Sequence, residues 1–209
     1  MGEGYYGVVY FGHYLGKPVA IKKLKQNIPE NVLGKFVQEV NILSNIDHPN
    51  IVKYIGAILE PEFFCIVTEC MNSGNLWDYI HNKSFHFNET MILKISMDIT
   101  SAMEYLHHLK PMIIHRDLKS PNILCNRLEG QSMFSCKVAD FGLSRFFESS
   151  SEQQMTKGIG TAAWSAPGSF FFFSILFFNF IVFFNVKEVV RWQEYTEKAD
   201  IYRYQFNFY

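Results

Sequence analysis

The residues best suited to chemistry lie in the run His115-Arg116-Asp117-Leu118-Lys119-Ser120-Pro121-Asn122. Its proline and small polar residues indicate a loop. In such a loop Asp117 can face a substrate hydroxyl while the amide oxygen of Asn122 faces a metal ion, and Lys119 can add positive charge beside a transferred phosphoryl group. A polar surface turn is the plainer alternative, but these residue types at this spacing are a strong signal for the chemistry.

Two further groups of residues favour the chemical interpretation. The sequence Asp140-Phe141-Gly142 follows the apolar pair Val138-Ala139 and supplies a second carboxylate. Lys22 ends the apolar run Val19-Ala20-Ile21-Lys22, and Glu39 lies on the inner face of the next predicted helix. A carboxylate in such a place is costly unless it is paired. We therefore expect a Lys22–Glu39 ion pair that holds the ammonium group near the phosphates of a nucleotide.

A glycine-rich segment opens the chain, with Gly2, Gly4 and Gly7 in the pattern Gly-x-Gly-x-x-Gly-x-Val. Without a Cβ atom, backbone N–H groups can come close to phosphate oxygens. Taken alone, the pattern is more typical of a glycine-rich hairpin turn. No Lys-Ser or Lys-Thr pair follows, so the segment is not a Walker A loop.

Hydrophobic periodicity predicts the elements that position these residues. Apolar and β-branched runs predict strands over 5–11, 18–24, 51–58 and 63–71, with 12–17 as a break. Apolar spacings of three and four predict helices over 29–46, from 75 to 80 and onward from 88. Asn88 can cap the last helix, whose apolar face carries Ile92, Ile95, Ile99, Met103 and Leu106. The order predicts an α+β pair of lobes joined near residues 69–75.

Composition argues against several classes of protein. The net charge of -1 gives no basic surface for nucleic acid or an anionic membrane. The four cysteines form no Cys-x-x-Cys pair and have no histidines at zinc spacing, so we expect reduced thiols in a cytoplasmic protein. The chain does not open with a signal peptide.

In this order the motifs resemble the eukaryotic protein kinase domain, from Gly2 to about Trp164 and again after residue 187. The resemblance implies an α+β bilobal fold, with a small β-rich N-lobe carrying one helix over 1–69, its first strand incomplete. A larger, incomplete helical C-lobe is expected over 70–167. It also implies ATP and Mg²⁺ as cofactors and a protein as the phosphate acceptor.

The resemblance also implies a role for each matching residue. Asp117 would be the catalytic base, Asn122 and Asp140 would hold Mg²⁺, and Lys22 would contact the α- and β-phosphates. Thr68 matches the gatekeeper before a hinge over 69–71. The expected catalytic set is Asp117, Lys119, Lys22 and Glu39. The expected ATP-binding set is Gly2, Gly4, Gly7, Val9, Ala20, Lys22, Thr68, Glu69, Met71 and Leu124. Leu43, His115 and Phe141 match parts of an internal hydrophobic spine.

The hydroxyl specificity follows from mixed features. Lys119 stands two residues after Asp117, as in Ser/Thr kinases, whereas 66–69 and 73–76 look like a tyrosine kinase. This mixture resembles the tyrosine-kinase-like group, most of which phosphorylates Ser or Thr, and Tyr stays open. Within the activation segment, Thr161 matches the threonine of the substrate-proximal loop. Candidate phosphorylation sites are Ser149, Ser150, Ser151 and Thr156, although a mobile serine-rich loop is an equal interpretation.

The chain departs from the family at Ala166-Pro167-Gly168, where Ala-Pro-Glu is expected. A run without charge, 169–186, follows, and the resemblance resumes over 188–202 before a tail, 203–209, that does not match. Deleting 168–187 joins Pro167 to Glu188 and restores the motif. We expect a translated intron, with a genuine insertion and a membrane span as alternatives.

Three functions remain open at this level. The first is a protein kinase of intracellular signalling. The second is a catalytically inactive scaffold, which the apparent truncation favours although every catalytic position is filled. The third, a membrane-embedded signalling protein, depends only on 169–186. Nothing in the sequence indicates an oligomeric state.

Overall fold

The computed structural model describes residues 2–3, 7–25, 29–60, 63–127 and 134–147. The predicted insert 168–187, the segment 188–202 and the tail 203–209 lie outside these ranges, as does the run 169–186 that was considered as a membrane span. Within the described ranges no helix is both long enough and apolar enough to span a bilayer.

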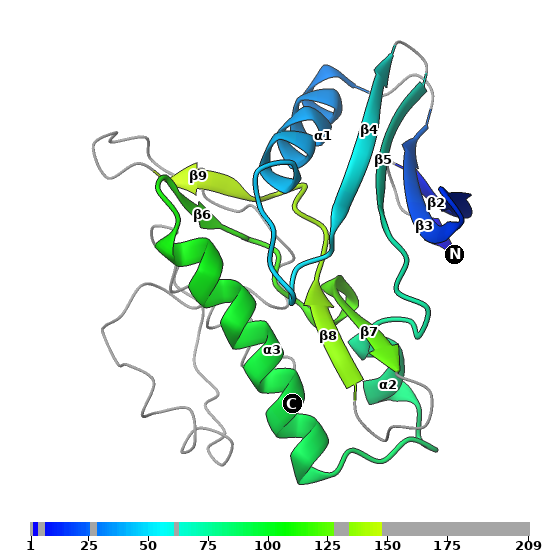
Figure 1. Ribbon diagram of the computed structural model, residues 1–209, viewed down its shortest axis with the longest axis vertical. Helices are drawn as coiled ribbons and strands as arrows, with labels where there is room; N and C mark the ends of the chain where they lie inside the picture. The colour runs from blue at the N-terminus through cyan, green and yellow to red at the C-terminus, as the bar shows by residue number, and fades with distance from the viewer. Residues whose placement is uncertain (1, 4–6, 26–28, 61–62, 128–133, 148–209) are drawn as a thin grey trace.

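An antiparallel sheet of five strands, in the order β1-β2-β3-β5-β4, forms the first part of the fold. Figure 1 shows this sheet and helix α1 in the upper half of the view. The strands are β1 (Gly2–Glu3), β2 (Gly7–Tyr14), β3 (Lys17–Leu24), β4 (Tyr54–Glu60) and β5 (Phe63–Glu69).

Several strand boundaries differ from the predictions; β5, for example, ends at Glu69 and not at Met71. The predicted break over 12–17 was too long, because β2 continues to Tyr14 and the chain reverses through Leu15 and Gly16 at φ 49° and 75°. Positive φ is what a tight hairpin turn needs, and Gly16 adopts it without steric cost. Strand β4 begins at Tyr54 and not at Ile51, because Val52 N–H donates instead to the carbonyl oxygen of Val138 at 3.0 Å.

Helix α1 (Glu30–Leu43) occupies the middle of the predicted range 29–46. Pro29 precedes it, and a proline fits there because the first N–H groups of a helix have no intrahelical partner. Its buried face carries Phe36, Ile42 and one charged residue, Glu39. An amphipathic helix thus carries a carboxylate inward, toward the sheet.

Helices and two short antiparallel strand pairs form the second part of the fold, most of which lies in the lower half of Figure 1. Asn75 and Asn88 cap their helices, with side-chain oxygens that accept from Asp78 N–H at 3.0 Å and Met91 N–H at 2.8 Å. The cap predicted for Asn88 is therefore confirmed. The elements are α2 (Leu76–His81), α3 (Glu89–His108), β6 (Met112–Ile114), the 3₁₀ turn η1 (Ser120–Asn122), β7 (Ile123–Arg127), β8 (Phe134–Val138) and β9 (Arg145–Phe147).

Two antiparallel pairs, β6 with β9 and β7 with β8, hold the loops that follow β6 and β8. Helix α3 packs against them through a buried stripe that includes Ile95, Ile99 and Leu106. The predicted α+β architecture is confirmed.

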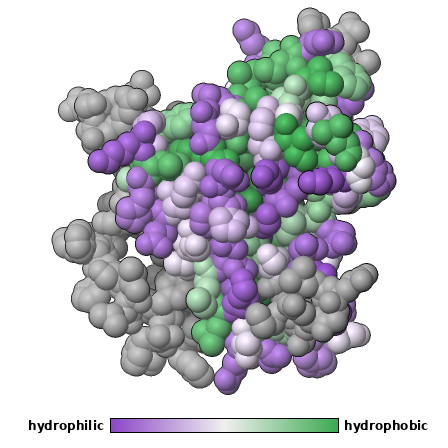
Figure 2. Space-filling view, in the orientation of Figure 1, coloured by the Kyte–Doolittle hydropathy of each residue, from purple (hydrophilic) through white to green (hydrophobic). Residues whose placement is uncertain are grey.

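The surface of the sheet half carries exposed apolar side chains. Ile58, Leu59 and Phe63 lie at the end of the β4–β5 hairpin with 38%, 48% and 44% of their surface exposed. Figure 2 shows hydrophobic atoms gathered over this upper half, above a band that is mainly hydrophilic.

Candidate active site

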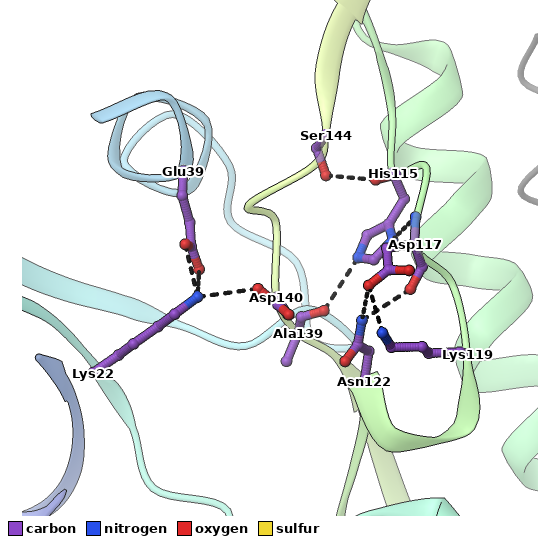
Figure 3. Close-up of polar contacts among 9 residues, drawn as sticks. All are labelled: Lys22, Glu39, His115, Asp117, Lys119, Asn122, Ala139, Asp140 and Ser144. Carbon is purple, nitrogen blue, oxygen red and sulfur yellow. Dashed lines mark hydrogen bonds and ion pairs between the residues drawn. The ribbon is translucent and has the colours of Figure 1, made fainter. Parts of the chain in front are cut away.

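Lys22, Glu39 and Asp140 meet at one point, although they come from three distant parts of the chain. The Nζ atom of Lys22 lies 2.9 and 2.8 Å from the two carboxylate oxygens of Glu39 and 3.0 Å from Oδ1 of Asp140 (Figure 3). The ion pair predicted between Lys22 and Glu39 is confirmed. Strand β3 delivers the lysine and the inner face of α1 delivers Glu39, which is 4% exposed.

The charges of this cluster support one another. Burial by itself lowers the pKa of Lys22, but Asp140 and Glu39 outweigh it, so the pKa lies above its usual value and the lysine stays an ammonium ion. The Lys22 ammonium in turn lowers the pKa of Asp140 to about 2. For Glu39, burial raises the pKa and Lys22 opposes the rise. Without Lys22, the ionised form of Glu39 would therefore be unfavourable at this buried position.

A second cluster forms in the loop after β6. The Nδ2 atom of Asn122 donates to the backbone oxygen of Asp117 at 2.8 Å and to its Oδ2 at 3.2 Å, and Lys119 Nζ lies 2.8 Å from the same Oδ2. Because both partners of Nδ2 are acceptors, the amide is oriented and its Oδ1 points away from Asp117. The 3₁₀ turn η1 makes this possible, since it brings Asn122 back toward Asp117.

Hydrogen bonds join the second cluster to Asp140. The ring of His115 bonds through Nε2 to the backbone oxygen of Ala139 at 3.1 Å, and Ala139 N–H donates to the backbone oxygen of Asn122 at 2.9 Å. Phe141 packs edge-on against His115, with ring centroids 4.9 Å apart. Asp140 itself has φ 62°, a conformation that costs free energy outside glycine and that its surroundings must hold. Asp140 is thus held in place relative to the loop that carries Asp117 and Asn122.

Several residues of the predicted ATP-binding set come from elements of both halves. Val9 on β2 pairs in register with Lys22, and Ala20 on β3 pairs with Thr68 on β5. Leu124 lies on β7. A hydrogen bond from Cys125 N–H to Gly74 O at 2.9 Å holds β7 against the segment between β5 and α2. Of the hinge residues, Glu69 ends β5 and Met71 is 9% exposed.

The glycine segment is described only in part. Gly2 lies in β1 and Gly7 begins β2, whereas Gly4 lies outside the described residues. A Cβ atom on Gly7 would come within 2.8 Å of the carbonyl oxygen of Lys23 on the paired strand. Close strand pairing therefore requires glycine at position 7, a reason that the sequence pattern alone did not suggest.

The activation-segment residues predicted from the sequence lie outside the described part of the chain. They are Ser149, Ser150, Ser151, Thr156, Thr161 and Glu188.

Sequence reasoning missed two sets of contacts. Lys137 on β8 forms an ion pair with Glu69 at 2.6 Å, and Lys53 N–H donates to the same Glu69 oxygen at 2.7 Å. Gln38 on α1 donates to the backbone oxygen of Ser144 at 2.9 Å. Sequence patterns do not relate residues that lie so far apart in the chain. A backbone carbonyl acceptor, moreover, does not restrict the type of residue that carries it.

The donor set fits a magnesium ion. Mg²⁺ prefers oxygen ligands and binds through one or two carboxylates together with substrate phosphates. Asp140 offers a carboxylate whose side chain is 46% exposed, and Asn122 offers the amide oxygen that points away from Asp117. Among the described residues there is no group of three or more His, Cys, Asp and Glu that could hold a metal by itself.

Comparison with known proteins finds one family over most of the chain. Residues 1–177 match the model of the protein tyrosine and serine/threonine kinase family. The probable serine/threonine-protein kinase drkA of Dictyostelium discoideum is 38% identical over 208 residues, which are 98% of this chain and 28% of that protein. SIS8 of Arabidopsis thaliana, a probable serine/threonine-protein kinase, is 38% identical over 205 residues, 98% of this chain and 17% of that protein. The human serine/threonine-protein kinase TNNI3K is 36% identical over 207 residues, 98% of this chain and 22% of that protein. The chain therefore spans less than a third of the length of these relatives.

Proposed function

The chain belongs to the protein tyrosine and serine/threonine kinase family, and from this we propose that it transfers the γ-phosphoryl group of ATP to a serine or threonine hydroxyl of a protein substrate. One observation carries the proposal. The Lys22–Glu39–Asp140 cluster and the Asp117–Lys119–Asn122 cluster are joined by hydrogen bonds through Ala139 and His115 (Figure 3). This arrangement supports a site in which a phosphate-binding cation, metal ligands and a base act together.

Each residue has a distinct task in this proposal. Lys22, oriented by Glu39, binds the α- and β-phosphates as a fixed positive charge. Asp140 and Asn122 hold Mg²⁺, which would neutralise charge on the phosphates and position the γ-phosphoryl group. Asp117 accepts the proton of the substrate hydroxyl through its carboxylate, and Lys119 neutralises charge that develops on the transferred group. Catalysis is then mostly positioning and electrostatic stabilisation.

The adenine ring would lie between Val9 and Ala20 on one side and Leu124 on the other. The backbone of the hinge, 69–71, would bind its polar edge. Support comes from the register of β2, β3 and β5 and from the bond that ties β7 to Gly74.

The choice of Ser or Thr over Tyr is supported by Lys119 and by the relatives. Lys119 contacts Asp117 directly, and the relatives named above are described as serine/threonine kinases. We assign the chain on this basis to the tyrosine-kinase-like group. We further propose that it acts in the cytoplasm on protein substrates and that Ser149, Ser150, Ser151 and Thr156 are sites of activating phosphorylation.

The proposal is tested by replacing Asp117 with Asn in the full chain. Loss of the base should lower the rate of ATP-dependent phosphorylation of a generic protein substrate about a hundred- to ten-thousandfold. The affinity for Mg·ATP, measured by calorimetry, should change little because Asp117 does not bind nucleotide. The matched control is Asp78→Asn on the exposed face of α2, which should leave both quantities unchanged.

Two outcomes would oppose the proposal. Unchanged turnover in Asp117→Asn would remove Asp117 from the reaction. A chain that binds Mg·ATP but transfers no phosphate before any substitution would favour the scaffold alternative.

A further inference from the structure

A hydrogen bond connects α1 to the segment that follows Asp140. The Nε2 atom of Gln38 donates to the backbone oxygen of Ser144 at 2.9 Å. Ser144 has no exposed surface, and its own hydroxyl donates to the backbone oxygen of His115 at 3.0 Å (Figure 3). A single buried residue therefore links the helix that carries Glu39 with the loop that carries Asp117.

We propose that Gln38 is a positioning residue that anchors α1 on Ser144, so that Glu39 stays in place to orient Lys22. The proposal deepens the kinase function proposed above and rests on it. It adds a residue that neither touches the nucleotide nor belongs to the motifs by which the chain was identified.

Helix geometry explains why the position next to Glu39 is suited to this task. Successive residues of an α-helix project about 100° apart around its axis. Glu39 is bound to Lys22 and Gln38 is bound to Ser144, so α1 is attached in two different directions. The buried face of α1 already restricts rotation of the helix about its own axis, and the two polar attachments restrict it further from two directions. The bond of Gln38 therefore helps to set the orientation at which Glu39 meets Lys22.

The second reason concerns what happens when nucleotide binds. Lys22 contacts both Glu39 and Asp140, so in the structure it joins α1 to the segment after β8. With nucleotide bound, Asp140 would hold the metal and Lys22 would contact the phosphates, so the direct link between these two side chains would weaken. Gln38 and Ser144 take no part in binding nucleotide, so their hydrogen bond persists and holds α1 to the segment during turnover.

Ser144 is a firm anchor for this bond. Its N–H donates to the backbone oxygen of Phe141 at 3.0 Å, which closes a turn directly after Asp140. Its carbonyl oxygen also accepts from Nη1 of Arg145 at 3.2 Å. When Gln38 is replaced, this carbonyl oxygen keeps a donor. The replacement should therefore cost little global stability while it frees the helix.

The test compares Gln38→Met with the unaltered full chain, using Mg·ATP and myelin basic protein as the phosphate acceptor. Methionine has a similar length but cannot donate a hydrogen bond. We expect kcat to fall about three- to tenfold, the effect of one lost hydrogen bond, with a smaller change in the KM for ATP. The matched control is Lys35→Met, which puts the same side chain one turn earlier on α1 and should leave kcat unchanged.

A double-variant cycle with Glu39→Gln separates positioning from a general structural effect. If Gln38 acts through Glu39, Gln38→Met should change kcat less than about twofold once Glu39 is already replaced. An effect of equal size in both backgrounds would overturn the proposal, because it would show that Gln38 acts independently of Glu39.

A second readout needs no catalytic activity. Amide hydrogen exchange over 36–43 of α1 in the full chain should be about three- to tenfold faster in Gln38→Met, while exchange in α3 stays the same. Exchange at the unaltered rate in α1 would overturn the proposal. A chain that phosphorylates nothing, but whose α1 exchange responds as expected, would refute the proposed function and leave the anchoring role of Gln38 in place.

Discussion

Replacing Lys22 with Met removes the charge that holds Glu39 and Asp140 but keeps most of the apolar volume of the side chain. Glu39 is 4% exposed and loses both of its hydrogen bonds from Nζ. Breaking one partner of a buried ion pair costs about 3–5 kcal/mol. Lys22 has 34% of its side chain exposed, so water screens part of the interaction. We expect the free energy of unfolding to fall by about 2–3 kcal/mol.

The loss should depend on pH in a defined direction. Burial raises the pKa of Glu39 and Lys22 opposes the rise, so the pKa must rise further when Lys22 is replaced. In the unfolded chain the Glu39 carboxyl group has a pKa of about 4.3 and is ionised above that pH. In the folded protein its pKa is higher, so over a range of pH above about 4.3 the group is still protonated in the folded state. The destabilisation caused by burying the Glu39 carboxyl group is absent below its pKa in the unfolded chain. It grows as the pH rises through the higher pKa of the folded protein. The deficit of Lys22→Met should therefore be larger at about pH 8 than at about pH 5.

Urea unfolding followed by circular dichroism at both pH values measures this deficit. Adding Glu39→Gln to Lys22→Met should recover at least about half of it at high pH, since a neutral amide is easier to bury than a charge. Lys17→Met, on the exposed part of the same strand, is the control and should stay within about 0.5 kcal/mol of the unaltered chain. A deficit that is equal at both pH values, or that Glu39→Gln fails to reduce, would refute the reasoning.

Two further substitutions test the helix cap at Asn88 and the ion pair between Asp140 and Lys22. Asn88→Ala removes the acceptor that binds Met91 N–H and should lower the free energy of unfolding by about 1 kcal/mol in urea titrations, and a loss near zero would contradict the cap. Asp140→Asn removes a carboxylate whose pKa Lys22 lowers to about 2, so the stability that it contributes is present above the unfolded pKa and is lost as the pH falls toward 2. Because the side chain of Asp140 is 46% exposed, we expect a difference of about 1 kcal/mol or less at neutral pH that narrows below about pH 4, and a difference that stays constant with pH would count against the Lys22–Asp140 interaction.

Much of the fold was predictable because local patterns decide it. The apolar spacing that predicts α3, and the cap at Asn88, are properties of residues near one another in the chain. Element ends were less predictable. Strand β4 begins at Tyr54 because the backbone N–H of Val52 donates a hydrogen bond to Val138. A local sequence pattern cannot predict this partner, because two helices separate it from Val52 in the chain.

The residues proposed for the chemistry could also be named from the sequence, for a different reason. Lys22, Asp117, Asn122 and Asp140 need particular side-chain groups, so chemistry restricts the residue type at each position. The Lys22–Glu39 pair could be inferred before the structure because a buried carboxylate requires a partner. The reason for glycine at position 7 could not, because it lies in the carbonyl oxygen of Lys23 across the strand pair.

The sequence by itself therefore determined the family and the α+β architecture, and it led to the set of side chains proposed for phosphoryl transfer. Only the tertiary structure decided how that set is held. Gln38 bonds to the backbone of Ser144, and Ser144 bonds to the backbone of His115. Every residue offers a backbone carbonyl, so such bonds put no demand on residue type at the acceptor, and only the folded chain shows which carbonyl is within reach.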